Sequence, residues 1–246
     1  MTPGQLLVVV LASLAGATVK SVTGMGYPVL AVPLIALVLG VEDAVVLVAL
    51  PNLGANLYLW WESRDVRSQT RDLPRLVGFG TVGAVIGTVA LVSLPEEPLL
   101  VGLALTIAVF VVNFTLRPDV AFDPATATRW SPAVGTVVGM LQGAIGVSGP
   151  VVATWIHGYR LAPKVYVHTV TTIFGITGAV QIVMLLLQGQ FDRERLVAAA
   201  FAAVPVAVVT PLGVRLRGRL AGPAFGRVVL AVLLLSAGSL LLDAVS

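Results

Sequence analysis

The sequence contains no cysteine, which excludes disulfides, thiolate metal sites and cysteine nucleophiles. It is also poor in charge, because only 11% of its 246 residues are Asp, Glu, Lys or Arg, against about 25% in soluble proteins. Its two histidines are far apart and its acidic residues lie outside the apolar runs, so we expect no metal site and no cofactor. An intramembrane enzyme needs a nucleophile with a base, or a metal centre, and these shortages argue against an enzyme.

Apolar residues make up 57% of the chain, and the mean hydropathy is +0.98. A hydrocarbon core of about 30 Å takes roughly 20 apolar residues per helical pass, so the apolar runs predict an all-α polytopic membrane protein of about eight to ten segments. The net charge of +3 does not indicate nucleic acid, since the basic residues form small clusters between apolar runs. The first run, 6–19, is not expected to be a cleaved signal peptide, because residues 1–5 carry no Lys or Arg.

The sequence contains an internal repeat. Gly24-Met-Gly-Tyr-Pro28 aligns with Gly146-Val-Ser-Gly-Pro150, and 87–94 aligns with 213–220 after a small shift. Each half is predicted to hold five segments: 5–19, 27–39, 43–61, 75–94 and 98–116, then 131–142, 150–160, 165–187, 196–214 and 224–243. The predicted organisation is a first repeat at 1–116, a cytoplasmic linker at 117–130 and a second repeat at 131–246.

The placement of Lys and Arg predicts that the two repeats are inverted. Most basic residues lie in four connecting stretches, 62–75, 117–130, 160–164 and 215–227. Loops 40–43 and 95–98 have none, and 188–195 has two. Because short cytoplasmic loops collect Lys and Arg, the halves have opposite orientations and both termini are predicted outside the cytoplasm, in a bacterial or archaeal inner (plasma) membrane. Inverted repeats with interrupted helices are typical of carriers that hold substrate near the midplane.

The first two segments of each half are short, at about 11 to 15 residues or roughly 17–22 Å. They are predicted to form a hairpin that either crosses or re-enters the membrane, with its tip at 20–26 or 142–149. Non-helical backbone at membrane depth must be buried in protein or line a wet cavity, so both tips are expected to line a pathway.

The tips have the chemistry of an anion site. Pro28 and Pro150 suit the first turn of a helix, whose free N–H groups and partial positive charge attract oxyanions. Thr23 and Ser148 add hydroxyl donors. The glycines at 24, 26, 146 and 149 allow a turn and close approach of a ligand. The alternative is that these small residues only let helices pack closely.

Lys20 is the only charged side chain placed between apolar segments, and an anionic substrate is its natural partner. The alternative is that Lys20 reaches water at the surface. Asn52 and Asn56 share a helix face, and Thr172 lies on the corresponding segment of the second half; for these polar groups, hydrogen bonding between helices is the alternative. His168 is a candidate for proton coupling, with simple solvation as the alternative.

The sequence resembles the sulfite exporter TauE/SafE family, also described as toluene-sulfonate uptake permease-like (TSUP) proteins, over nearly its full length. The residues that carry the resemblance are Thr23–Pro28 with Ala31–Pro33, Arg64–Arg67 before a glycine-rich helix, and Gln142–Pro150. The resemblance implies transport of sulfite, sulfonates or related organic anions. Met25 and Tyr27 interrupt the denser glycine cluster of many members, and Tyr27 is expected to narrow or line the site.

The sequence therefore predicts a secondary carrier of a small oxyanion that works by alternating access, with a passive anion channel as the alternative. The candidate substrate-binding residues are Lys20, Thr23, Gly24, Gly26, Tyr27, Asn52, Asn56, Gln142, Gly146, Ser148, Gly149 and Thr172. The anion, the direction of transport and its coupling stay open at this stage. The expected partners are the anion and the lipid bilayer, and a homodimer is one option for assembly.

Overall fold

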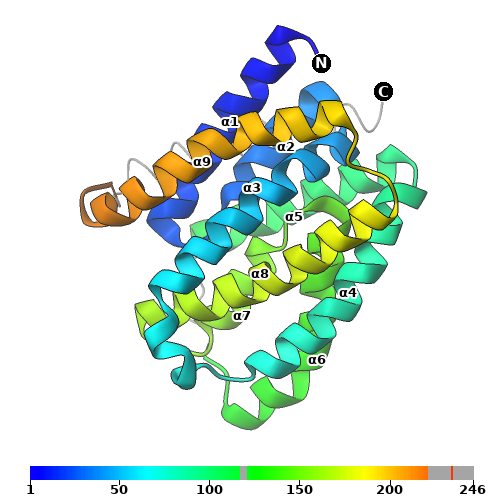
Figure 1. Ribbon diagram of the computed structural model, residues 1–246. Helices are drawn as coiled ribbons and strands as arrows, with labels where there is room; N and C mark the ends of the chain where they lie inside the picture. The colour runs from blue at the N-terminus through cyan, green and yellow to red at the C-terminus, as the bar shows by residue number, and fades with distance from the viewer. Residues whose placement is uncertain (117–120, 221–233, 235–246) are drawn as a thin grey trace.

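The computed structural model describes residues 1–116, 121–220 and 234, with the backbone alone for 22–23, 113–114 and 217–220 (Figure 1). Over these residues the chain is all helical: α1 (Pro3–Thr23), α2 (Tyr27–Leu39), α3 (Val41–Glu62), η1 (Arg64–Gln69), α4 (Leu73–Ser93), α5 (Glu96–Leu116), α6 (Pro124–Ile145), α7 (Gly149–His157), α8 (Pro163–Leu187) and α9 (Arg193–Leu220). A helix is present at each of the first nine predicted segments, and the tenth, 224–243, lies outside the described residues.

Five of the described helices are long and apolar enough to cross a bilayer: α1, α3, α4, α8 and α9. Their outward faces are apolar as well, as at Val82 and Ile86 on α4 and at Val204 and Val208 on α9, all of which are exposed. Exposed aliphatic faces of this extent suit lipid rather than water. The protein is an all-α polytopic membrane protein, as the composition predicts.

The leading helix of each predicted hairpin is longer than expected. α1 has 21 residues and α6 has 22, whereas only the second helices, α2 with 13 and α7 with 9, are short. The prediction of two short segments was wrong for α1 and α6 because the predicted segments stop at Lys20 and Gln142, while the helices continue past these residues. α6 also begins inside the predicted linker, at Pro124, where the Asp123 carboxylate caps the first turn.

Glycines allow α4 and α6 to pack backbone against backbone. A Cβ atom added to Gly83 would lie 2.1 Å from the Thr136 carbonyl oxygen, and one added to Gly139 would lie 1.9 Å from that of Gly80. α9 also approaches α1 closely at a glycine, but against a side chain, since a Cβ atom on Gly213 would lie 1.9 Å from Ser21 Oγ. Small residues thus bring these helices closer than larger side chains would allow.

Further contacts place α4 against α8 and α9 against α3, while α3 and α8 run side by side (Figure 1). The helix α4 of the first half therefore packs against α6 and α8 of the second half. The helix α9 of the second half packs against α1 and α3 of the first.

Connecting stretches rich in arginine and lysine meet at one end of the bundle. Lys164 pairs with Asp65 at 2.8 Å, and the Thr128 hydroxyl donates to the Asp72 carboxylate at 2.9 Å. The guanidinium of Arg71 lies 5.2 Å from the ring of Tyr159. These contacts join the 62–75, 117–130 and 160–164 stretches, all three of which were predicted to be on the same side.

The acidic connections meet at the opposite end, where α3 begins. Arg195 pairs with Glu42 at 2.9 Å and with Asp43 at 2.6 Å. The Glu96 carboxylate accepts from the Val41 N–H at 2.9 Å. The loops predicted to share the second side, 40–43, 95–98 and 188–195, are therefore also neighbours.

Candidate functional site

The first tip, between α1 and α2, is a tight turn built on glycine. α1 ends at Gly24, which has a φ of 84°, and its N–H donates to the Lys20 carbonyl at 2.8 Å. Gly26 has a φ of 105° and precedes Tyr27 and Pro28 in the first turn of α2. Left-handed backbone strains any residue with a Cβ atom, so both glycines have a conformational reason to be there. The turn places Lys20 one helical turn before the tip.

Lys20 is buried among uncharged partners, with only 1% of its surface exposed. Its ammonium donates to Asn56 Oδ1 at 2.6 Å and to Asn52 Oδ1 at 3.1 Å, and it lies 5.9 Å from the ring centroid of Phe174. None of the ion pairs among the described residues includes Lys20. The alternative in which Lys20 reaches water is wrong. Burying an ammonium without a carboxylate is costly, which is expected of a functional group rather than a packing element.

Asn56 leaves a hydrogen-bond donor unused beside this ammonium. Its Nδ2 is buried and has no partner among the described residues, while its Oδ1 is occupied by Lys20. An ammonium has three N–H donors, of which these contacts use two. Lys20 and Asn56 can therefore both donate to the oxygens of an anion placed beside them.

A cavity of about 840 Å³ adjoins Asn56 between α3 and α8. Apart from Asn56, Thr171 and Thr172, its lining is mainly apolar and includes Leu57 and Ile176. The Thr172 hydroxyl donates to the His168 carbonyl at 2.7 Å, so it would have to rotate to reach a ligand. Leu57 and Ile176 are exposed, so this cavity opens on the outer surface of the bundle beside Asn56 and can accept an apolar group there.

The second tip, between α6 and α7, repeats the same backbone. α6 ends at Gly146, with a φ of 67°, whose N–H donates to the Gln142 carbonyl at 3.1 Å. Gly149 and Pro150 open α7. Gln142 thus occupies the position that Lys20 has at the first tip.

The side chains at the second tip bond to one another. Ser148 Oγ donates to Gln142 Oε1 at 3.1 Å, and Gln142 Nε2 donates to Gln181 Oε1 at 3.3 Å. Gln181 Nε2 in turn donates to the Gln142 carbonyl at 2.8 Å. Gln181 was not among the predicted residues, although an amide within the apolar run of α8 is the kind of signal that could have identified it. This network holds α6 to α8.

Each tip packs against the start of the third helix of the other half. A Cβ atom on Gly24 would lie 3.2 Å from Val167 Cγ2 on α8, and one on Gly146 would lie 3.4 Å from Val45 Cγ2 on α3. The structure groups Lys20 with Asn52 and Asn56, and Gln142 with Ser148. Between the described residues, no hydrogen bond joins the two groups.

The remaining predicted residues have other surroundings. The Tyr27 hydroxyl lies 3.1 Å from Ser13 Oγ, so it faces α1, and the side chain of Thr23 lies outside the described residues. His168 is buried, with Nδ1 3.2 Å from Ser63 Oγ and its ring stacked on Trp60. Simple solvation of His168 is therefore wrong, and its hydrogen-bond partner is a serine of the α3 end.

Comparison with protein families assigns the chain. The family model "Sulfite exporter TauE/SafE" matches residues 8–240, nearly the whole chain. The chain belongs to the TauE/SafE sulfite exporter family. This confirms the resemblance carried by the two glycine-proline tips and makes the protein a multi-pass membrane transporter, of a family that moves sulfite-like anions. No curated protein and no solved structure shows a significant match.

Proposed function

We propose that this TauE/SafE protein is a secondary carrier of a small oxyanion, sulfite, a sulfonate or a related organic anion, held at the first tip by Lys20 and Asn56. One observation carries the proposal. The Lys20 ammonium is buried with no acidic partner among the described residues, next to the unused Nδ2 donor of Asn56. An anion would neutralise the charge and accept from both groups, which turns a costly arrangement into a satisfied one.

The cavity beside Asn56 supports an anion with an organic part. Its lining is mainly apolar, and its volume of about 840 Å³ is larger than bare sulfite requires. Burial of an apolar group there would add affinity in proportion to the area removed from water. We therefore expect sulfonates with an alkyl or aryl group to bind more tightly than sulfite.

The repeat provides a basis for alternating access. The same interval of sequence separates Gly24 from Gly146, Pro28 from Pro150 and Val45 from Val167, and α4 and α9 exchange corresponding contacts between the halves. Two inverted copies of one unit can rock against each other around a fixed site. In this proposal the arginine-rich end faces the cytoplasm of a bacterial or archaeal cell, and the acidic end, with the N-terminus, faces out.

The alternative is a passive anion channel of the same architecture. A channel needs a continuous wet path, whereas the donors at Lys20 and Asn56 are buried from solvent. This burial favours a carrier that opens to one side at a time. Counterflow of anion would support a carrier, and ohmic single-channel current would support a channel.

The test is anion flux in proteoliposomes that contain the full chain, with labelled sulfite and labelled methanesulfonate. Lys20→Met removes the charge at similar volume, and we expect flux to fall by about 100-fold, the cost of losing a charged hydrogen-bond donor. Gln142→Met, at the equivalent place of the second tip, is the matched control and should retain flux. Unchanged flux in Lys20→Met would contradict the assigned site, and no flux of either anion in the wild type would contradict the substrate class.

A further inference from the structure

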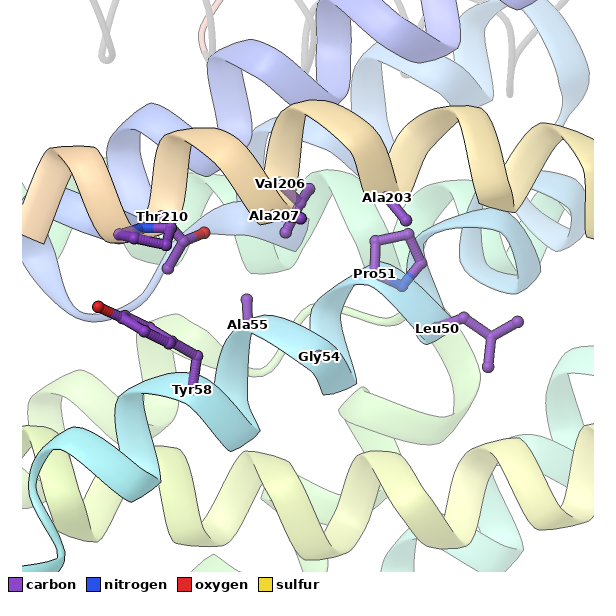
Figure 2. Close-up of a pocket in the computed structure, with 10 residues that line it drawn as sticks. Leu50, Pro51, Gly54, Ala55, Tyr58, Ala203, Val206, Ala207 and Thr210 are labelled. Carbon is purple, nitrogen blue, oxygen red and sulfur yellow. The ribbon is translucent and has the colours of Figure 1, made fainter.

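A second cavity, separate from the Lys20 group, lies between α3 and α9 (Figure 2). It has a volume of about 290 Å³, and most of its wall is apolar, including Leu50, Pro51, Ala203 and Val206. The anion carrier proposal does not use it. Leu50 and Ala207, which line it, are exposed on the apolar outer surface of the bundle, so the cavity can be reached from the bilayer.

Thr210 is unusual among the buried threonines of the described chain. Its hydroxyl is buried and has no hydrogen-bond partner there. The other buried threonines donate to the carbonyl four residues earlier, namely Thr88, Thr106, Thr169, Thr171 and Thr177. This local bond is the usual way to satisfy a hydroxyl in a membrane helix, and an unpaired hydroxyl in hydrocarbon is costly. The hydroxyl of Thr210 is instead turned away from that bond, in the wall of the cavity.

The two hydroxyls of the cavity lie at the same end of it. Tyr58, on α3, faces Thr210 across the gap between the helices, and Leu50 and Ala203 lie at the far, apolar end (Figure 2). Tyr58 is half-buried, and within the described part of the chain its hydroxyl has no hydrogen bond to another residue. Two hydroxyl donors at one end of an apolar slot fit a ligand with a hydrogen-bond acceptor at the head of an apolar chain.

The distance of Tyr58 from the end of α3 suits the depth of an ester group in a lipid. Tyr58 lies four residues before Glu62, the last residue of α3, which is about 6 Å along a helix. The headgroup layer on each side of the roughly 30 Å core is about 5–7 Å thick. With Glu62 at the water-facing edge of this layer, Tyr58 and the neighbouring Thr210 would lie where the acyl chains begin. The apolar end of the cavity points from there toward the bilayer centre, as an acyl chain does.

We propose that the α3–α9 cavity is a binding site for one ester-linked phospholipid of the leaflet at the arginine-rich end. Its ester carbonyl accepts from the Thr210 and Tyr58 hydroxyls, and its acyl chain fills the apolar part of the cavity. A carbonyl oxygen has two lone pairs, so one ester can satisfy both hydroxyls. Arg215, exposed further along α9, lies toward the headgroup side.

The test is native mass spectrometry of the full chain released from nanodiscs of palmitoyl-oleoyl phosphatidylglycerol or of its diether analogue, which lacks the carbonyls. We expect the wild type to retain the ester lipid about fivefold more than the ether lipid, the equivalent of about one hydrogen bond. Thr210→Val should abolish this preference. Thr88→Val, the same substitution at a hydroxyl already bonded to Ala84, should keep it.

Two further variants keep the proposal testable if Thr210→Val does not fold. Tyr58→Phe should weaken the ester preference, and Ala207→Leu, which fills the cavity, should reduce retention of both lipids. Equal retention of the two lipids by the wild type would overturn the proposal, as would an ester preference that survives in Thr210→Val. If oleate added to the ether nanodiscs binds in place of lipid, with the same dependence on Thr210, the ligand is a free fatty acid and the lipid assignment fails.

Discussion

The two tips have the same backbone and different chemistry. Each is a helix that ends at a left-handed glycine, followed by a short helix with proline in its first turn. At the first tip the residue before the turn is Lys20, whose partner Asn56 keeps a free donor. At the second it is Gln142, whose side chain is engaged by Ser148 and Gln181. In our proposal the turn alone therefore does not define a ligand site, and the side chains one helical turn before it do.

The largest expected effect comes from placing a carboxylate at the first tip. Asn56→Asp would pair with Lys20 and neutralise the charge that we assign to the anion, so sulfonate affinity should fall by about 100-fold. The folded protein should not lose stability, because the buried ammonium gains a partner. Isothermal titration with methanesulfonate and thermal unfolding measure the two effects. If Asn56→Asp binds methanesulfonate as tightly as the wild type does, the charge of Lys20 does not bind the anion. The proposed chemical difference between the tips is then contradicted.

The hydrogen-bond network at the second tip can be disrupted by replacing Gln181, the residue at its centre. Gln181→Leu leaves the Gln142 amide unpaired, which should lower the free energy of unfolding by about 1–3 kcal/mol, with sulfonate affinity unchanged. Adding Gln142→Leu removes both partners and should recover part of that loss. Thermal unfolding of the single and double variants checks this. If Gln181→Leu costs more free energy of sulfonate binding than free energy of unfolding, the substrate contacts both tips.

The backbone similarity of the tips predicts similar costs for alanine at the two turns. Gly24→Ala and Gly146→Ala both place a Cβ on left-handed backbone, at φ values of 84° and 67°. Each should be destabilising by about 1–2 kcal/mol. Chemical denaturation of the purified variants in detergent gives both values. A much larger cost at only one of the tips would show that their turns are not equivalent.

The smallest effect is expected at the ion pair between Lys164 and Asp65. Lys164 lies at the beginning of α8, the helix against which the first tip packs. The hydrogen bond from Lys164 holds the pKa of the Asp65 carboxyl below its ordinary value of 3.8. Because the folded pKa is the lower one, this pair stabilises the fold above pH 3.8, and the contribution is lost as the pH falls through the folded pKa. Asp65→Asn should flatten this acid dependence slightly, since the pair is exposed and solvent-screened. An unfolding curve that keeps the same acid dependence in the variant would exclude a role for Asp65.

The sequence was sufficient to locate both tips and the polar group formed by Lys20, Asn52 and Asn56. Glycine and proline identify the turns at 24–28 and 146–150, and the spacing of Asn52 and Asn56 places both on the face that contacts Lys20. The apolar pattern could not give the length of α1, because Lys20 interrupts the run although the helix continues past it. A lysine that is hydrogen-bonded inside a bundle looks the same in sequence as one at the end of a helix.

Pairing between distant helices explains the remaining omissions. Ser13 and Gln181 become informative only when their partners are known, Tyr27 on α2 and Gln142 on α6. Local patterns of residues do not predict such pairs, because they depend on how helices cross. The unused donors of Asn56 and Thr210 likewise become visible only when all neighbours have been counted.

The most direct measurement is to locate a bound anion. Selenite, a heavier analogue of sulfite, can be soaked into crystals of the protein and found by the anomalous scattering of selenium. We predict one peak beside Lys20, with selenite oxygens within hydrogen-bonding distance of Lys20 Nζ and Asn56 Nδ2, and no peak at Gln142. A selenite bound at the Gln142–Ser148 tip, or an occupied crystal with no selenium near Lys20, would contradict the assignment of the first tip as the anion site.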